Sequence, residues 1–200
     1  MEAMRILLDE HQSLAAIIHA IRHMIREIGA GNQKPDFKLL QAMVHYLDAY
    51  PEKKHHPKED EFLFGPLRAR TDRANAVLDR LEAEHAISDE RIATLTEALR
   101  NYETDPAGQF EAFQTAFEKY AEFYREHMML EEREVLPLIR ECFTDEDWAF
   151  ANAGFAKCLD PMWGPRRSGG EEDFTKIFSR LVQAAPAPIG LGLGPYKDDE

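Results

Sequence analysis

Four stretches of the sequence carry apolar residues at alternating spacings of three and four, and this pattern leaves few folds open to the chain. Such spacing places apolar side chains on one face of a helix, so each stretch predicts a helix that faces a shared core. The four stripes are Leu7, Leu14, Ile18, Ile21, Ile25 and Ile28; Phe37, Leu40, Val44 and Leu47; Leu78, Leu81, Ile92, Leu95 and Leu99; and Phe110, Phe113, Phe117, Tyr120 and Leu138. The pattern predicts an all-α fold, an antiparallel up-down four-helix bundle with extra short helices at the C-terminal end.

Helix-breaking residues mark the connections between these stretches. Residues 29–32, Gly-Ala-Gly-Asn, end the first helix, and residues 104–108 form a turn before the fourth. Within the second helix the apolar stripe slips by one residue after Leu47. Pro51 and Pro57 each remove a helical hydrogen bond there, so we expect a kink or a wide turn.

The chain is predicted to have three parts: a bundle over residues 1–141, a helical appendage over residues 142–185 and a flexible tail over residues 186–200. Thr144 precedes three acidic residues, so we expect it to cap a short helix that Pro161 stops. The appendage is predicted to pack across the bundle or to make a homodimer contact. Its last helix would cover residues 171–184, and its apolar anchors would be Trp148, Phe150, Phe155 and Trp163.

Six ionisable residues interrupt the apolar stripes, and all six are predicted to lie at one height in the bundle. A buried, unpaired charge costs several kcal/mol, so this set requires a common partner. Counted from the predicted turns, the four histidines stand roughly 32 Å from the same end of the bundle, at about 1.5 Å per residue. The six residues are His11, His55, Glu59, His85, His127 and Glu131.

The residue types in this layer indicate a metal site. The pairs His55/Glu59 and His127/Glu131 are each four residues apart, so both members project from one helix face. Imidazole and carboxylate together suit iron, manganese or zinc better than calcium or magnesium. Four histidines and two glutamates predict a dinuclear site, with two histidines for each metal and both glutamates bridging.

Several neighbouring residues leave alternatives open. His56, paired with Asp60, is an alternative ligand to His55. Asp89 is a ligand, an acceptor that orients His85, or a surface acid, and Tyr124 either bonds to a metal-bound oxygen or fills the core. We predict solvated faces for Asp60, Glu61, Glu132 and Glu134, and surface positions for His19, His23 and His45.

Two runs of sequence connect these residues to a known family. HHPKEDEFLFGPL, from His55, and HMMLEEREVLPLI, from His127, resemble the signature stretches of the hemerythrin/HHE cation-binding family. The resemblance covers roughly residues 5–141. It implies a hemerythrin-like four-helix bundle with a di-iron centre, whose ligands fall on the same six residues. The third helix offers one histidine where oxygen-carrying hemerythrins have an HxxxH pair, which counts against reversible oxygen carriage.

Composition excludes several classes of partner. With 24 basic and 37 acidic residues the net charge is -13, so neither nucleic acid nor an anionic membrane is expected to bind. The N-terminal residues lack the pattern of a signal peptide, and we expect a cytoplasmic protein. Cys142 and Cys158 form neither a CxxC motif nor a disulfide framework.

The resemblance and the predicted layer together favour a non-haem di-iron protein that binds or senses a small ligand such as oxygen or nitric oxide. The expected cofactor is two irons joined by carboxylate and by an oxo or hydroxo bridge, with zinc or manganese as weaker candidates. The alternative is a di-iron enzyme that consumes peroxide or nitric oxide or repairs iron–sulfur centres. A structural zinc bundle is the third reading, and a non-catalytic role is favoured over an enzyme.

Overall fold

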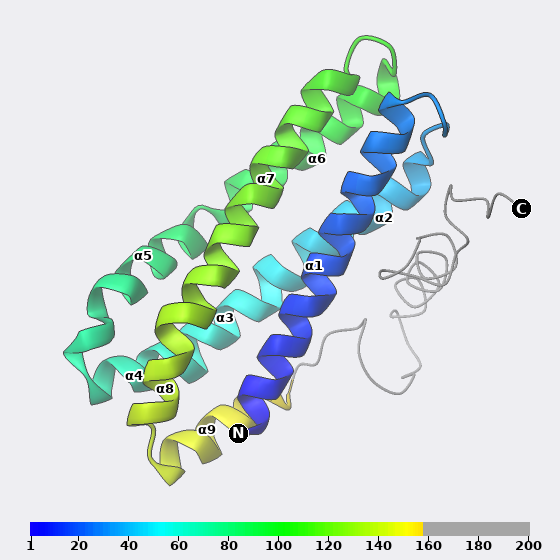
Figure 1. Ribbon diagram of the computed structural model, residues 1–200. Coiled ribbons are helices and arrows are strands. Elements are labelled where there is room, and N and C mark those ends of the chain that lie inside the picture. The colour runs from blue at the N-terminus through cyan, green and yellow to red at the C-terminus, as the bar shows by residue number, and fades with distance from the viewer. Residues whose placement is uncertain (158–200) are drawn as a thin grey trace, which may run out of the picture.

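The computed structural model describes residues 1–157 and is helical in every element of that range (Figure 1). The prediction of an all-helical bundle is confirmed. Within these residues no helix is both long enough and apolar enough to cross a bilayer. Pro161, Trp163, the predicted last helix and the predicted tail lie outside the described residues.

The long helical stretches lie side by side in Figure 1. The first is α1, which packs against α2 and α7, while α6 packs against both α2 and α7. The elements in chain order are α1 (Glu2–Gly29), α2 (Phe37–Leu47), η1 (Asp48–His55), α3 (His56–Glu59), η2 (Asp60–Phe64), α4 (Gly65–Arg70), η3 (Asp72–Ala74), α5 (Asn75–Ala86), α6 (Ser88–Thr104), α7 (Phe110–Leu130), η4 (Glu131–Val135), α8 (Leu136–Cys142) and α9 (Asp145–Phe155).

Local sequence explains where these helices begin and end. After α1, Gly31 takes a φ of 75°, a left-handed conformation that glycine adopts without steric cost. The Asp36 side chain caps α2 by accepting a hydrogen bond from the Leu39 backbone N–H. Thr144 and Asp147 form a capping box at the start of α9, as predicted for Thr144. Helix α9 ends at Phe155, earlier than the stop predicted at Pro161.

The expected kink in the second stretch is a pair of π-helical segments, η1 and η2. In an α-helix a four-residue step turns a side chain about 40° beyond a full turn, so three steps from Leu47 to Glu59 would drift about 120°. A π-helical turn takes up an extra residue and corrects this drift. His55 and Glu59 therefore stay on the core face that begins with Leu47.

The fourth stretch also contains a π-helical segment, which the sequence analysis did not predict. The π-helical segment η4 follows α7 and begins at Glu131. It moves the core positions to Val135 and Ile139, both 0% exposed, whereas the predicted core residue Leu138 is half-buried. Leu138 packs against the second apolar cluster but is not fully buried, because the π-helical segment shifts the helical face by one residue.

The third stretch is broken where a continuous helix was predicted. Ile87 leaves helical geometry, with φ -107° and ψ 6°, and separates α5 from α6. Its side chain is 41% exposed. The break lies two residues after His85, but Ile92, Leu95 and Leu99 beyond it are buried, as the predicted stripe places them.

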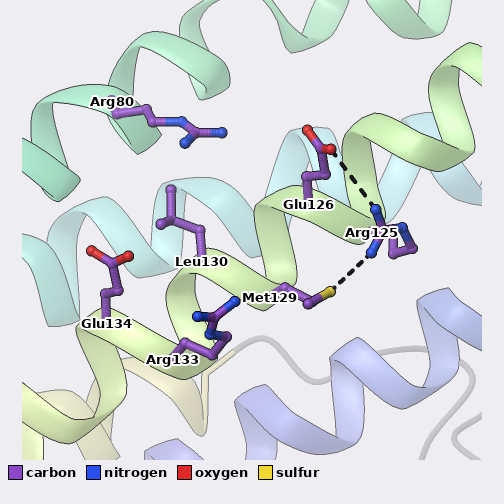
Figure 2. A pocket seen from close by; sticks show the side chains of 7 residues that line it. All are labelled: Arg80, Arg125, Glu126, Met129, Leu130, Arg133 and Glu134. Atoms are coloured by element: carbon purple, nitrogen blue, oxygen red, sulfur yellow. Dashed lines mark hydrogen bonds and ion pairs between the residues drawn. The ribbon is translucent and has the colours of Figure 1, made fainter.

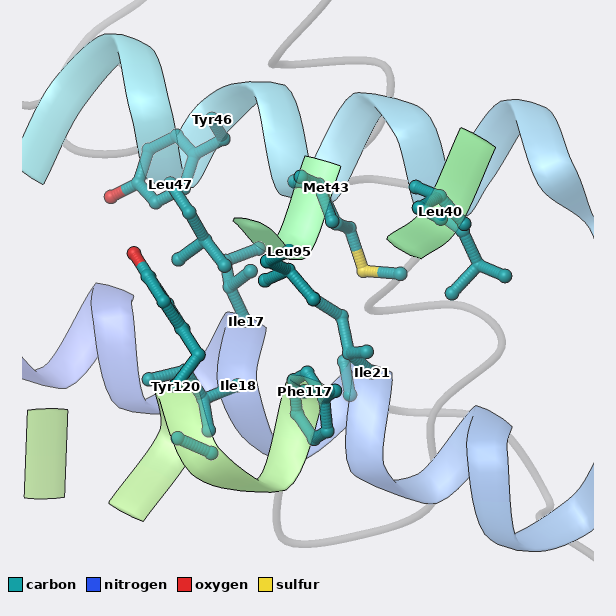
Figure 3. Packing of buried hydrophobic residues seen from close by; sticks show 14 of the residues in the cluster. Ile17, Ile18, Ile21, Leu40, Met43, Tyr46, Leu47, Leu95, Phe117 and Tyr120 are labelled. Carbon is teal, nitrogen blue, oxygen red and sulfur yellow. The ribbon is translucent and has the colours of Figure 1, made fainter. Parts of the chain in front are cut away.

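The apolar core consists of two clusters at different heights. One is built mainly from α1, α2, α6 and α7, and Figure 3 shows Ile21, Leu40, Leu95 and Phe117 converging in it. The other joins the start of α1 to α4, α5, α8 and α9. Along every stretch the buried apolar residues stop on one side of the six ionisable residues and resume on the other.

Helix α9 packs across one end of the bundle, against α1 and η2. Ala151 and Phe155 are 0% exposed, and the Asn152 side chain accepts a hydrogen bond from the Ala3 backbone N–H at 2.8 Å. Of the predicted anchors, Phe155 is buried, whereas Phe150 is 47% exposed. This helix therefore shares the second apolar cluster with the bundle.

Gly154→Ala is expected to lower the free energy of unfolding by about 1–3 kcal/mol, the usual cost of overpacking. A Cβ atom at this position would lie 2.3 Å from Cγ of Phe62. Gly65→Ala is the control, because its Cβ would make an ordinary 3.5 Å contact. Denaturant unfolding of both variants checks this, and equal stability of the two would contradict the packing described for α9.

Candidate metal centre

The six ionisable residues form one buried layer between the two apolar clusters. Glu59 is 0% exposed and Glu131 1%, and the side chain of His85, the most accessible of the six, is only 6% exposed. The layer draws on every long stretch: His11 from α1, His55 from η1, Glu59 from α3, His85 from α5, His127 from α7 and Glu131 from η4.

Each of the four histidines directs its Nδ1 atom at a carboxylate on the outside of the layer. The pairs are His11 with Glu132 at 2.9 Å, His55 with Glu10 at 2.7 Å, His85 with Asp60 at 2.8 Å and His127 with Glu84 at 2.8 Å. We call Glu10, Asp60, Glu84 and Glu132 the outer carboxylates. An ionised carboxylate only accepts hydrogen bonds, so Nδ1 carries the proton and Nε2 is left for the inside of the layer.

The outer carboxylates also close a cycle around the bundle. Each comes from one stretch and holds the histidine of the next: Glu10 of α1 holds His55, and Asp60 of η2 holds His85. Glu84 of α5 then holds His127, and Glu132 of η4 returns to His11 of α1. The orientation of every histidine is therefore fixed by a neighbouring stretch.

Inside the layer, each glutamate reaches two groups of histidines. Glu59 places Oε1 3.2 Å from Nε2 of His55 and Oε2 3.7 Å from Nε2 of His85. Glu131 places Oε2 3.2 Å from Nε2 of His11 and Oε1 3.3 Å from Nε2 of His127. Both carboxylates thus span the interval between a His11/His55 group and a His85/His127 group, as bridging ligands do.

The unpartnered atoms of the layer fit a metal. Both carboxylate oxygens of Glu59, both of Glu131 and Nε2 of His11 are buried without a hydrogen-bond partner. The Nε2 atoms of His85 and His127 face each other at 3.1 Å, although both rings direct Nδ1 at a carboxylate. Buried polar atoms are normally paired, and inward lone pairs at these separations match the donors of a cation.

A further histidine joins the layer. Donor atoms of His56, Glu59, His85 and His127 all lie within 4.8 Å of one another, and those of His11, His55 and Glu59 form a second such group. The His56 ring stacks on His85 with centroids 4.2 Å apart. Both His55 and His56 therefore reach the layer, and neither replaces the other. Asp60 pairs with His85, not with His56.

His56 has its own carboxylate and its own tyrosine. Its Nδ1 lies 3.1 Å from Oε2 of Glu52, a residue that is 6% exposed. The Tyr124 hydroxyl donates to Oε1 of Glu52 at 2.6 Å and lies 3.3 Å from Nε2 of His56. Tyr124 is thus buried with its hydroxyl paired, next to the layer.

Charges within the layer oppose the effect of burial on its histidines. Burial disfavours the imidazolium, but Glu131, Glu84 and Glu59 outweigh it and raise the pKa of His127 to about 10. In the same way Glu131, Glu132 and Glu59 raise the pKa of His11 well above its ordinary value despite burial. Burial instead lowers the pKa of His56. Without metal, the positive charge of protonated histidines balances the negative charge of the buried glutamates.

The sequence analysis predicted only part of the role of the acidic residues around the layer. Asp60 and Glu132 were predicted to lie on solvated faces; their side chains are 40% and 44% exposed, yet both hold a histidine. Of the three roles left open for Asp89, the structure shows a surface acid that is 69% exposed and pairs with Lys53. His19 and His45 are exposed, as predicted.

A signal for the outer carboxylates was present in the sequence. Glu10 and Glu84 each directly precede a histidine of the layer, and Asp60 and Glu132 each directly follow a glutamate of the layer. Adjacent helical residues point about 100° apart, so the first faces inward while its neighbour reaches sideways to the next stretch. The dipeptides Glu-His and Glu-acid therefore mark both sets of residues.

The surface pocket in Figure 2 lies outside this layer. It is lined by Arg80, Arg125, Glu126, Met129, Leu130, Arg133 and Glu134. Arg80 donates to Glu84 at 2.8 Å, and Glu84 accepts from His127 on its other side. The Glu84 carboxylate thus lies between this pocket and the layer.

Comparison with protein-family models gives one match. The model of the hemerythrin HHE cation binding domain matches residues 3–139. The corresponding searches of curated proteins and of solved structures gave no match. The matched range contains every residue of the layer and all four outer carboxylates, and it ends before α9.

The metal-free protein is expected to lose stability as the pH rises from about 6.5 to about 10. The ordinary pKa of histidine is about 6.5, and that of His127 is raised to about 10 in the folded chain. The folded state therefore holds protons that the unfolded state releases, and this stabilisation is complete below pH about 6.5 and lost above about 10. Denaturant unfolding of metal-free protein at several pH values across this range measures the loss of stability.

His127→Gln should make this decline smaller, because one of the histidines with a raised pKa is gone. His19→Gln, at an exposed histidine, is the matched control and should leave the decline unchanged. Metal affinity should rise over the same pH range, since metal binding displaces the same protons. A metal-free protein whose stability is constant from pH 6.5 to 10 would contradict this description of the layer.

Proposed function

The chain belongs to the hemerythrin HHE cation-binding family, and from this premise we propose that it holds two irons in its buried layer and binds a small ligand such as oxygen or nitric oxide there. The observation that carries the proposal is that both carboxylate oxygens of Glu59, both of Glu131 and Nε2 of His11 are buried without hydrogen-bond partners.

We propose that the ligands divide into two unequal positions. His11 and His55 serve one position, and His85 and His127 serve the other. Glu59 and Glu131 contribute one oxygen to each, as their distances to both groups support. These six residues are the metal ligands that we propose, with His56 as an addition to them.

His56 belongs with the second position. Its donor atom groups with those of His85 and His127, and its Nδ1 faces a carboxylate, as the Nδ1 atoms of the other four histidines do. The addition supplies a fifth histidine from the second stretch. The two positions then differ by one imidazole, and the small ligand should bind at the position of His11 and His55, which has fewer protein donors.

The number of donors counts against a structural zinc bundle. Imidazole and carboxylate suit iron, manganese and zinc, but the position of His85, His127 and His56 has three imidazoles and two carboxylate oxygens, one donor more than a structural zinc site. A bound pair of irons supplies open coordination positions and one-electron redox chemistry toward a small ligand. The chain itself fixes the donors and excludes water from them.

Specific residues of the chain perform these tasks. The outer carboxylates hold four histidines in the tautomer that presents Nε2 to the inside. The two apolar clusters close the layer on both sides. The Tyr124 hydroxyl is 3.3 Å from His56 and donates to Glu52, which places a polar group beside the second position.

We also propose the topology of the bundle, a contact between copies of the chain and a location for the protein. The contacts of α1 with α2 and α7, and of α6 with α2 and α7, support an antiparallel up-down four-helix bundle over residues 1–141. A homodimer contact through the C-terminal segment is supported by Phe150, which is 47% exposed on α9. We propose a cytoplasmic location, and the net charge of -13 supports a protein that binds neither nucleic acid nor an anionic membrane.

Aerobically purified protein is expected to contain close to two irons per chain, with near-ultraviolet absorption that bleaches on reduction. Glu59→Ala and Glu131→Ala should each weaken iron binding at least about 10-fold, because a bridging ligand is lost. The exposed acids Glu61→Ala and Glu134→Ala are matched controls and should retain both irons. His56→Gln should keep the iron but change the spectrum.

Metal analysis separates this proposal from a structural zinc bundle. Zinc as the bound metal, in a protein that takes up no ferrous iron, would refute a di-iron centre. Iron binding that survives both glutamate substitutions would refute the bridging roles of Glu59 and Glu131.

Exposure of the reduced protein to nitric oxide or oxygen should give a spectral change that saturates once each metal pair has bound its ligand. A binding or sensing protein consumes no further ligand after saturation. Sustained consumption of peroxide or nitric oxide would instead identify an enzyme. A spectrum that does not respond to either gas would contradict the open position assigned beside His11 and His55.

A further inference from the structure

The four outer carboxylates differ in their access to solvent. The side chains of Asp60 and Glu132 are 40% and 44% exposed, and that of Glu84 is 16% exposed and pairs with Arg80. Glu10 is only 3% exposed. The carboxylate that holds His55 is therefore the one that water solvates least, and its charge needs a partner inside the protein.

Lys58 is that partner. It is 5% exposed, and its Nζ donates to Oε1 of Glu10 at 2.5 Å and to the Tyr50 hydroxyl at 3.1 Å. The Tyr50 hydroxyl also donates to Oε1 of Glu10 at 2.5 Å. The other oxygen, Oε2, accepts from Nδ1 of His55 at 2.7 Å. One buried carboxylate thus connects an ammonium group to a histidine of the layer.

Helix α9 covers the ammonium from the opposite side. The Nζ of Lys58 lies 5.0 Å from the centre of the Phe155 ring and 5.4 Å from that of Tyr50, so two aromatic rings face it. Phe155 is 0% exposed. This helix lies beyond residue 139, where the family match ends. An element outside the matched domain therefore reaches the layer through Phe155, Lys58 and Glu10.

We propose that Lys58 is a positioning residue for His55 and that α9, through Phe155, keeps it in place. The ammonium holds the Glu10 carboxylate inside the protein, and Glu10 holds the His55 ring with Nε2 toward Glu59. Phe155 keeps water from the ammonium, which preserves the strength of the pair. The retention of metal at the position of His11 and His55 then depends on the docking of α9.

The physical reason is the cost of burying an unpaired charge. Without Lys58, the Glu10 carboxylate lacks its charge partner and gains by turning toward water. His55 then loses the acceptor that fixes its tautomer and ring orientation. Loss of such an acceptor typically weakens metal binding by about 10- to 100-fold.

The test uses the full-length chain with Lys58→Met, Lys58→Arg and Phe155→Leu. Lys53→Met is the matched control for charge, because Lys53 lies on the same stretch, is 48% exposed and pairs with a surface acid. Phe150→Leu is the control for α9, since Phe150 is 47% exposed. If Lys58→Met does not fold, Lys58→Arg and Phe155→Leu decide the result, because they keep the charge or the apolar contact.

Two measurements are made on each variant. The first is the rate at which iron-loaded protein loses iron to a chelator, compared with the unfolding midpoint of the metal-free form. The second is the side-chain ¹⁵N chemical shift of His55 in metal-free protein, which reports its tautomer. The second measurement needs no metal, so it stands even if the proposed iron centre fails.

Lys58→Met should lose iron about 10-fold faster or more and shift the His55 signal. Phe155→Leu should change the rate of iron loss and the His55 signal in the same direction as Lys58→Met, but to a smaller extent. Lys58→Arg should match the wild type closely in both measurements. The two controls should match the wild type. A Lys58→Met protein with unchanged His55 signal and unchanged iron release would overturn the proposal, as would equal effects of Lys53→Met.

Discussion

The cycle of four carboxylate–imidazole hydrogen bonds is the interaction on which the rest of the structure depends. It joins α1 to η1, η2 to α5, α5 to α7 and η4 to α1. Each stretch is held at a defined height and rotation, because a shift by one turn would move an ionised group into an apolar cluster. Burial of an unpaired ion costs several kcal/mol, so such shifts are strongly disfavoured. The cycle therefore sets the register of the bundle as well as the orientation of its histidines.

The sequence predicted the layer but not the geometry that produces it. Equal distances from the turns placed His11, His55, His85 and His127 at one height, and the structure brings them together. That argument survives local irregularity, because it uses only the length of each helix. The predicted face of the fourth stretch was less robust, because the π-helical segment η4 changes the phase of that helix. Periodicity assumes a constant number of residues per turn, and it fails where that number changes.

The outer carboxylates were missed for a related reason. Asp60 and Glu132 lie off the apolar stripes, and a half-exposed acid off a stripe is ordinarily solvated. Their role depends on a histidine of the neighbouring stretch, and the apolar stripe of one helix gives no information about such a contact. Lys58 was overlooked on the same grounds, since lysine is rarely buried and its cover, Phe155, comes from a distant part of the chain. Contacts between stretches, rather than patterns within them, determine these residues.

The layer also has an internal symmetry with a functional consequence. Glu10, His11, His55, Glu59 and Asp60 of the first half correspond to Glu84, His85, His127, Glu131 and Glu132 of the second. A twofold operation would therefore exchange the His11/His55 group with the His85/His127 group. Three residues of the first half have no equivalent: His56, Lys58 and Glu52 stand where the second half has Met128, Leu130 and Tyr124. The first repeat alone thus carries the side chains that make the two otherwise matched histidine groups chemically different.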